Sequence, residues 1–366
     1  MRYMAPTPDD MASPPPNREI DDQHVAVSVI LPIRNESAFI ERSLGAVLAQ
    51  DYPHHLLEVL IADGMSTDDT RQRIERLAQT HPAIRVSVVD NPGRIVPSGF
   101  NLAVARARGD VIVRVDGHTI VSPDYVRECV AALKRSGADN VGGRMVAVSH
   151  GRFGEAVAQA TSVRFGVGGA RFHYSEREEW VDTVYMGAWP RRVFETIGLF
   201  DEEQVRNQDD EFNYRLLDQG GRILLSPSIK SHYYNRSSMR SLWKQYYQYG
   251  YWKVRVMQKH PAKMRPRQFA PPLLAASLLL TLGLAPFSEV GRWGLLLVTG
   301  AYLAANLTAS AITAGRSDWR LFPRLVIAFA ILHLSYGLGF LRGLVAFRGR
   351  WGDRGKWANL EPRDAG

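Results

Sequence analysis

The sequence predicts an α/β protein with a doubly wound sheet, followed by transmembrane helices at the carboxyl terminus. Over residues 25–225, short apolar segments rich in Val, Ile and Leu alternate with amphipathic segments. Such alternation with short connections is typical of a mainly parallel sheet joined by right-handed crossovers. Residues 268–288 and 293–315 contain no charged side chain, and each segment is long enough to cross a bilayer.

Each element of the sheet domain follows from local patterning. Apolar runs bounded by turn residues predict strands at 25–31, 58–62, 84–89, 111–115, 140–148, 183–188 and 222–225. Helical periodicity between breakers predicts helices at 38–50, 70–79, 97–107, 123–134, 153–163, 191–197 and 208–217. The glycine-rich residues 166–179 are expected to form a mobile loop, and residues 238–257 an interfacial helix.

Charge and hydropathy divide the rest of the chain. The net charge is +8, yet residues 230–268 alone hold ten basic residues and no acidic one. Directly ahead of the uncharged segments, this stretch is expected to rest on anionic lipid at the cytoplasmic face. The expected domains are a disordered tail at 1–24, the catalytic sheet domain at 25–235, a basic aromatic juxtamembrane segment at 236–267, a membrane region of two or three helices at 268–347 and a basic tail at 348–366.

The number of membrane crossings stays open. A third apolar segment, 325–341, is only marginally long. Three crossings would place the basic tail outside, against the positive-inside rule, whereas a re-entrant or interfacial third segment would remove the conflict. The first 24 residues lack the apolar core of a signal peptide, and the single cysteine, Cys129, excludes an internal disulfide.

Polar side chains gather where the predicted strands end, which is where open α/β sheets bind ligands. They are Arg34, Glu36, Asp63, Asp116, His118, Asp209 and Asp210. Each alone is equally well explained as a turn or a helix cap. Asp116 and His118 stand two residues apart and could share one divalent metal ion. Because no glycine-rich phosphate loop follows the first strand, a nucleotide would be held by carboxylates and a metal.

Four motifs together point to one family. They are VILPIRNE at 29–36, DGMSTDDT at 63–70, DGH at 116–118 and QDDEFNYR at 208–215. Residues 27–225 thereby resemble the catalytic domain of family 2 glycosyltransferases, which has the nucleotide-diphospho-sugar (GT-A) fold. The nearest subgroup is the membrane-anchored, succinoglycan-type exopolysaccharide glucosyltransferases. The chain departs from the family pattern at His118, where a second Asp is usual, at Gln208, where Glu is usual, and at Tyr251, where processive synthases have Arg.

The resemblance implies a role for each candidate residue. Asp209 would be the catalytic base that deprotonates the acceptor hydroxyl, and the neighbouring Asp210 is the alternative. A divalent metal, Mg²⁺ or Mn²⁺, would be held by Asp116, His118 and His232. The nucleotide sugar would be bound by Pro32, Arg34, Glu36, Asp63, Asn101 and Asp116.

The resemblance further implies an inverting hexosyltransferase, a multi-pass protein of the cytoplasmic membrane with its catalytic domain facing the cytoplasm. The enzyme would move a sugar from a nucleotide-diphospho-sugar, expected to be a UDP-sugar, to a lipid-linked saccharide in exopolysaccharide or cell-surface glycan synthesis. Three alternatives stay open: direct transfer to polyprenyl phosphate, nucleotidyl transfer on the same fold, and a non-catalytic membrane scaffold. No nucleic-acid partner is expected.

Overall fold

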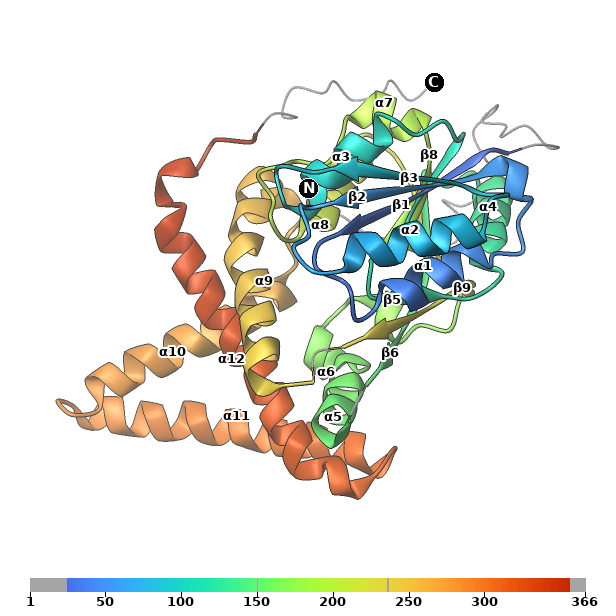
Figure 1. Ribbon diagram of the computed structural model, residues 1–366. Helices are drawn as coiled ribbons and strands as arrows, with labels where there is room; N and C mark the ends of the chain where they lie inside the picture. The colour runs from blue at the N-terminus through green and yellow to red at the C-terminus, as the bar shows by residue number, and fades with distance from the viewer. Residues whose placement is uncertain (1–24, 150, 236, 356–366) are drawn as a thin grey trace.

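The computed structural model describes residues 25–149, 151–235 and 237–355 of the chain. The expected tail at 1–24 and residues 356–366 of the expected basic tail lie outside this part. A sheet domain sits against a group of long helices, and the helix at the carboxyl end runs back toward the sheet domain (Figure 1).

One mixed sheet of nine strands forms the core of the described domain, in the order β3-β2-β1-β4-β8-β6-β9-β5, with β7 paired to β9. The strands are β1 (Val27–Ile33), β2 (Leu57–Asp63), β3 (Arg85–Asp90), β4 (Val111–Arg114), β5 (Thr119–Val121), β6 (Asn140–Val148), β7 (Glu179–Val181), β8 (Tyr185–Pro190) and β9 (Ile223–Tyr234). The strands β3, β2, β1 and β4 are parallel, as the alternating pattern predicts. Strand β8 is antiparallel to both β4 and β6, so the sheet is mixed.

Helices cover both faces of the sheet. One face carries α1 (Ile40–Leu48), α2 (Thr70–Thr80) and α4 (Tyr125–Ser136), and the other carries α3 (Val96–Val104), α7 (Arg192–Ile197) and α8 (Gln208–Asp218). All seven residues of β1 are buried, and Val29 and Leu31 belong to the first apolar cluster while Ile30 belongs to the second. This period of two is expected of a strand covered on both faces.

Three long apolar helices follow the domain: α10 (Ala270–Leu284), α11 (Glu289–Gly315) and α12 (Phe322–Ala346). Among the described residues, the helical stretches long and apolar enough to cross a membrane are Pro266–Leu284, Glu289–Gly315 and Trp319–Ala346. The helices α10 and α11 form a hairpin that projects away from the sheet domain (Figure 1). Only 11% of the apolar window in each of these two stretches is buried, against 44% in the third, so protein encloses more of α12 than of α10 or α11.

Helix α12 lies along α9 (Met239–Lys259), and the two backbones come close enough to require glycine. A Cβ atom on Gly339 of α12 would lie 2.0 Å from the carbonyl oxygen of Tyr247. A Cβ atom on Gly250 of α9 would lie 2.0 Å from the carbonyl oxygen of Tyr336. Small residues permit such close helix packing. Helix α12 also packs against α5 (Gly151–Thr161) and α6 (Arg164–Val167), which belong to the sheet domain.

Three cations of the basic stretch face the sheet domain and are buried, which corrects the expectation that the whole stretch rests on lipid. Composition counts charges but does not say which face of a helix carries them. Exposed members such as Arg240 and Lys244 remain available to a membrane surface. The buried cations are Lys253, Arg255 and Lys259, and their carboxylate partners are Asp210, Glu203 and Asp201.

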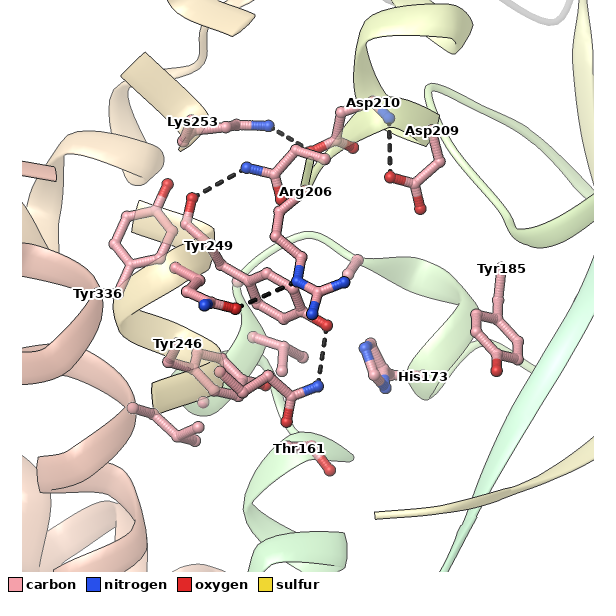
Figure 2. A pocket seen from close by; sticks show the side chains of 18 of the residues that line it. Thr161, His173, Tyr185, Arg206, Asp209, Asp210, Tyr246, Tyr249, Lys253 and Tyr336 are labelled. Carbon is pink, nitrogen blue, oxygen red and sulfur yellow. Dashed lines mark hydrogen bonds and ion pairs between the residues drawn. The ribbon is translucent and has the colours of Figure 1, made fainter. Parts of the chain in front are cut away.

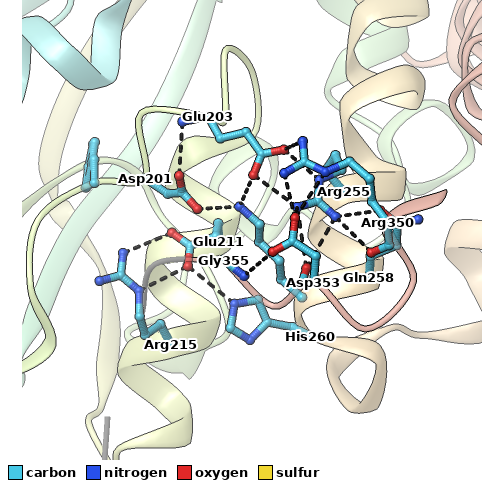
Figure 3. A network of polar contacts seen from close by, with 12 residues as sticks. Asp201, Glu203, Glu211, Arg215, Arg255, Gln258, His260, Arg350, Asp353 and Gly355 are labelled. Atoms are coloured by element: carbon cyan, nitrogen blue, oxygen red, sulfur yellow. Dashed lines mark hydrogen bonds and ion pairs between the residues drawn. The ribbon is translucent and has the colours of Figure 1, made fainter. Parts of the chain in front are cut away.

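An ion-pair cluster fixes the end of α12 to the sheet domain (Figure 3). Arg255 is fully buried, and its guanidinium donates to both carboxylate oxygens of Glu203, at 2.8 and 3.0 Å. Arg350, just beyond α12, pairs with the same carboxylate. A buried guanidinium is tolerated only with such bidentate pairing. We call this set the buttress; its members are Asp201, Glu203, Arg255, Lys259, Arg350 and Asp353.

Candidate active site

A cavity of about 1480 Å³ extends from the carboxyl ends of β1 and β4 to the long helices. Its domain wall is built from residues within 32–36, 114–118 and 205–210. Its membrane-side wall is built from α6, α9, α10, α11 and α12. The site predicted at the edge of the sheet is thus one part of a larger cavity that the apolar helices complete.

Most of the predicted donor-binding residues line the domain end of this cavity. Pro32, Arg34 and Glu36 lie directly at or after the end of β1, and Asp116 and His118 follow β4. The imidazole Nδ1 of His118 lies 3.1 Å from a carboxylate oxygen of Glu36. The parallel register of β1 and β4 brings these two strand ends side by side, which explains why residues about 80 positions apart meet here.

Arg114, the last residue of β4, is a site residue that the sequence reasoning missed. Its guanidinium lies 2.8 Å from the carboxylate of Asp116, and the side chain is buried in the cavity wall. Burial disfavours its charge, but Asp116 and Asp209 raise the pKa of Arg114, so it stays cationic. Its Nη1 atom has no hydrogen-bond partner among the described residues. A charged residue inside the otherwise apolar run 111–115 was the available signal.

The predicted metal site is only partly assembled. His232, the predicted third ligand, lies in a strand and not in a loop, and it is outside the cavity lining. The chain was expected to leave the sheet after residue 225, but β9 continues to Tyr234. Side chains alternate along a strand, so Tyr233 lines the cavity while His232 is exposed and outside the lining. Within the described residues no three His, Cys, Asp or Glu side chains are grouped to hold a metal ion. Asp116 and His118 therefore fit a metal whose other ligands arrive with the substrate, because phosphate oxygens can complete the coordination.

Asp63 and Asn101 do not line the cavity, so its geometry gives no support to their predicted donor-binding roles. Asp63 is fully buried and accepts hydrogen bonds from the backbone and hydroxyl of Ser66, while Arg71 pairs with it at 2.5 Å. Asn101 bonds the backbone of Phe200 in both directions. Both side chains hold loops in place, because they form hydrogen bonds to neighbouring backbone and side-chain groups.

The acidic start of α8 places two carboxylates in the cavity in different surroundings (Figure 2). Asp210 pairs with Lys253 of α9 at 2.6 Å. Asp209 has no ion-pair partner among the described residues and accepts one hydrogen bond, from the Asp210 backbone at 3.1 Å. Burial, and then the charge of Asp210, raise the pKa of Asp209. Asp209 is therefore the carboxylate better suited to accept a proton.

The rest of the QDDEFNYR motif holds α8 in position. Glu211 and Arg215 are both almost fully buried and form an ion pair one helical turn apart, with distances of 2.9 and 3.0 Å. Arg215 also donates to the backbone carbonyl of Leu199 at 2.9 Å, which ties the helix to the preceding loop. The helix begins at Gln208, with Asn207 as its N-cap, so Asp209 lies in the first turn and is not the cap.

The membrane side of the cavity contributes polar residues that no local pattern predicted. Arg206 reaches from the loop before α8 toward α9, where its Nε donates to Gln248 at 3.2 Å (Figure 2). His333, inside α12, lies 2.7 Å from the carbonyl oxygen of Phe165 in α6 and 3.1 Å from the hydroxyl of Tyr302 in α11. Residues 166–179, expected to form a loop, contain the end of α6 and a short helical turn at Arg171–His173.

The fold and this site define a glycosyltransferase of the GT-A class. Residues 28–198 match the family model of glycosyl transferase family 2. The succinoglycan biosynthesis protein ExoA of Rhizobium meliloti is 30% identical over 324 residues, which cover 88% of this chain and 96% of that protein. The chain therefore belongs to glycosyltransferase family 2, and the resemblance read from its motifs is confirmed.

Two further comparisons extend this result. A dolichyl N-acetyl-alpha-D-glucosaminyl phosphate 3-beta-D-2,3-diacetamido-2,3-dideoxy-beta-D-glucuronosyltransferase of Methanococcus voltae is 27% identical over 329 residues, covering 87% of this chain and 97% of that protein. The mannosyltransferase PcManGT of Pyrobaculum calidifontis, solved with GDP-Man and Mn²⁺, has a TM-score of 0.55 at 22% identity and covers 87% of both chains. The predicted GT-A fold is thereby confirmed.

Proposed function

We propose that the enzyme transfers a sugar from a nucleotide-diphospho-sugar to a lipid-linked saccharide and inverts the anomeric configuration. The observation that carries this proposal is the continuous cavity, whose walls include Asp116, Asp209 and the helices α10, α11 and α12. A lipid-linked acceptor has to reach the base from the bilayer, and a wall of apolar helices suits that path. The names of the relatives from R. meliloti and M. voltae support a role in exopolysaccharide or cell-surface glycan synthesis.

The donor, proposed to be a UDP-sugar, lies at the domain end of the cavity against Pro32, Arg34, Glu36 and Asp116. Asp116 and His118 would hold a divalent metal, Mg²⁺ or Mn²⁺. When bound, this metal supplies positive charge to the leaving diphosphate. The Mn²⁺ present with GDP-Man in PcManGT supports this assignment. Arg114 orients the Asp116 carboxylate, because the two side chains form an ion pair.

Asp209 takes the proton from the attacking acceptor hydroxyl. A raised pKa makes a carboxylate a stronger base, and Asp209 combines this with the absence of a cation partner among the described residues. Asp210 is held by Lys253 and positions the start of α8. One base that acts on the side opposite the leaving group implies inversion, so an α-linked donor gives a β-linked product.

The sheet domain is proposed to face the cytoplasm. The membrane helices begin beside the sheet domain and end beside it, because Arg350 beyond α12 pairs with Glu203. This return places Arg265 and Arg267, just before α10, on the same side as Arg348 and Arg350 beyond α12, because Phe269 packs against Phe340, and this agrees with the positive-inside rule. Three full crossings would place the basic tail outside, against the positive-inside rule. This conflict is removed if α12 returns to the side on which α10 began.

The test is a transfer assay on the full-length enzyme in membranes, with radiolabelled UDP-glucose, UDP-N-acetylglucosamine and GDP-mannose in parallel. Label should enter the organic-solvent extract, depend on Mg²⁺ or Mn²⁺, and be released by mild acid as an oligosaccharide, because acid cleaves the sugar–phosphate bond to the lipid but not the new sugar–sugar bond. Release of the label as a monosaccharide would indicate direct transfer to polyprenyl phosphate instead. Pyrophosphate release from a nucleoside triphosphate and a sugar phosphate would replace the proposal with nucleotidyl transfer.

A further inference from the structure

The membrane side of the cavity carries a group of cations that the donor site does not use. Arg206 lies in the loop before α8, and Lys244 lies on α9 one turn from Gln248. Arg164 begins α6, and Arg267 lies just before α10, over Gly169 of the segment that follows α6. All four line the cavity, and each belongs to a segment that borders the long helices.

Arg206 is the central member of this group because it is half-buried and lacks a charged partner. Its Nε donates to Gln248, and the neighbouring Asn207 donates to the carbonyl oxygen of Tyr249 at 2.9 Å, so the loop is fixed to α9. No carboxylate among the described residues forms an ion pair with Arg206, whereas the buried cations Arg114 and Lys253 each have one. A guanidinium held in a cavity without a counter-charge is a site for an anion, because partial burial makes an unpaired charge costly.

The acidic residues of the lining do not neutralise this end of the cavity. Glu36, Asp116 and Asp210 lie beside His118, Arg114 and Lys253. Asp182 is shared between Arg265 at 2.9 Å and Arg267 at 4.0 Å. Asp209 is the remaining acidic residue of the lining, and with Asp182 it sets two carboxylates against the four cations, so the membrane side keeps a net positive charge.

An apolar chamber continues from these cations. Its walls come from three different membrane helices, and the residues are Leu274 of α10, Leu297, Val298 and Ala301 of α11, and Leu332 of α12. A cationic zone that opens into a chamber of aliphatic side chains matches a ligand with a phosphate group on a long apolar chain. A free phosphate would leave the apolar chamber unused, and a neutral lipid would leave Arg206 without an anion.

We propose that Arg206, with Arg164, Lys244 and Arg267, binds the phosphate or diphosphate of the acceptor lipid, and that the lipid chain lies against α10, α11 and α12. This inference rests on the proposed function, because it assigns the acceptor's anchor to the same cavity. Arg206, in the loop fixed to α9, precedes Asp209 in the first turn of α8 by three residues, so a phosphate bound there holds the acceptor saccharide beside the base.

The test uses the full-length enzyme in nanodiscs of zwitterionic phosphatidylcholine and measures dissociation constants. The probes are geranylgeranyl diphosphate, geranylgeraniol, which lacks the phosphates, and inorganic pyrophosphate. Saturating UDP with Mn²⁺ occupies the donor end throughout. The diphosphate lipid should bind at least tenfold more tightly than either other probe, because it alone fills both zones.

Arg206→Gln should weaken binding of the diphosphate lipid about tenfold, the size expected for a lost charge-assisted hydrogen bond. Arg206→Lys should recover part of the loss, and UDP affinity should be unchanged in both variants. Arg240→Gln is the matched control, because Arg240 lies on the same helix as Lys244, is exposed, and is outside the cavity lining. Equal binding of geranylgeraniol and its diphosphate, or equal effects of the Arg206 and Arg240 changes, would overturn the inference.

Two arms separate the remaining possibilities. If phosphatidylglycerol added to the nanodiscs displaces the probe through Arg206, the site binds ordinary membrane phospholipid and the acceptor assignment is wrong. In the transfer assay, Arg206→Gln should raise KM for the lipid acceptor more than it lowers kcat. Normal transfer with an unchanged acceptor KM sinks the inference and leaves the proposed function standing, whereas no transfer by the wild-type enzyme removes the proposed function itself.

Discussion

Asp209 in the cavity wall and Glu203 in the buttress lie on one short segment, but their surroundings shift their pKa values in opposite directions. Asp209 faces the cavity, and burial and its neighbour Asp210 raise its pKa. Glu203, six residues earlier, is also partly buried, but hydrogen bonds from Arg255 and Lys259 lower its pKa to about 2. Burial acts in the same direction on both groups, so the cation partners decide the difference.

This difference distinguishes residues that take part in the reaction from residues that stabilise the fold. A carboxylate that is fully paired, as Glu203 is, stabilises the docking of α9 and α12 but has little basicity left for chemistry. A buried carboxylate that forms no ion pair with any described residue, as is the case for Asp209, costs stability and gains reactivity. The two regions should therefore respond to substitution in different measurements, the cavity wall in turnover and the buttress in thermal unfolding.

The largest effect is expected at the base. Asp209→Asn should lower kcat by about 10² to 10⁴, because Asn cannot accept the acceptor's proton. The midpoint of thermal unfolding should change little, since Asp209 contributes at most about 1 kcal/mol through the dipole of the first helical turn. Donor binding should also persist in a direct titration.

Asp210→Asn is the matched control for this change. It removes the partner of Lys253, so it should lower thermal stability more and turnover less than Asp209→Asn does. If Asp210→Asn is inactive while Asp209→Asn turns over normally, the roles of the two residues are reversed.

The next effect is expected in the buttress. Arg255→Met leaves Glu203 and Asp353 without their buried partner, and breaking such a pair costs about 3 kcal/mol or more. The midpoint of thermal unfolding in detergent should fall clearly. Arg240→Gln, an exposed change on the same helix, should stay within about 0.5 kcal/mol of the wild type. Equal midpoints for the two variants would show that the buttress carries no stability.

The smallest expected effect is a difference between two pH values: the pH at which activity falls because Asp209 is protonated, and the lower pH at which the stabilisation by Glu203 is lost. Activity requires ionised Asp209, so kcat/KM should fall with decreasing pH at an apparent pKa above the usual value of about 3.9 for aspartate. Glu203 has a lowered folded-state pKa, so its stabilisation is complete above its unfolded value of 4.5 and is lost as pH falls toward about 2. The midpoints of thermal unfolding of the wild type and Glu203→Gln should therefore differ above pH 5 and approach each other as the pH falls from 4.5 toward about 2. A difference that stays constant over this range would contradict the linkage.

Much of the fold could be predicted because its signals are local. The parallel strands β1, β2 and β4 are mostly apolar runs, and each is bounded by breakers within a few residues. The strands β5 and β7 have three residues each, too few to show a period of two, and β9 extends past residue 225 because its second half pairs with β5 and β6. Pairing with distant strands leaves no trace in the neighbouring sequence.

The restriction of sequence signals to local structure also explains which site residues could be predicted. The positions of Arg34, Asp116 and Asp209 follow from strand ends and helix starts, which the sequence marks. His232 was assigned to a loop, and only the register of β9 determines that it points away from the cavity. Arg206 and Arg114 could be recognised as site residues only from the folded structure, in which α9 and the sheet pack around them. Their roles remain predictions.

The return of α12 to the sheet domain means that this enzyme cannot be divided into a soluble half and a removable anchor. A chain cut before α10 would expose the face of α9 that Gly339 approaches, and would leave Glu203 without Arg350. Recombination between related enzymes should therefore succeed only when the segment from Asp201 to the end of α12 is exchanged whole. We therefore expect the catalytic loop and the membrane helices to tolerate exchange only together.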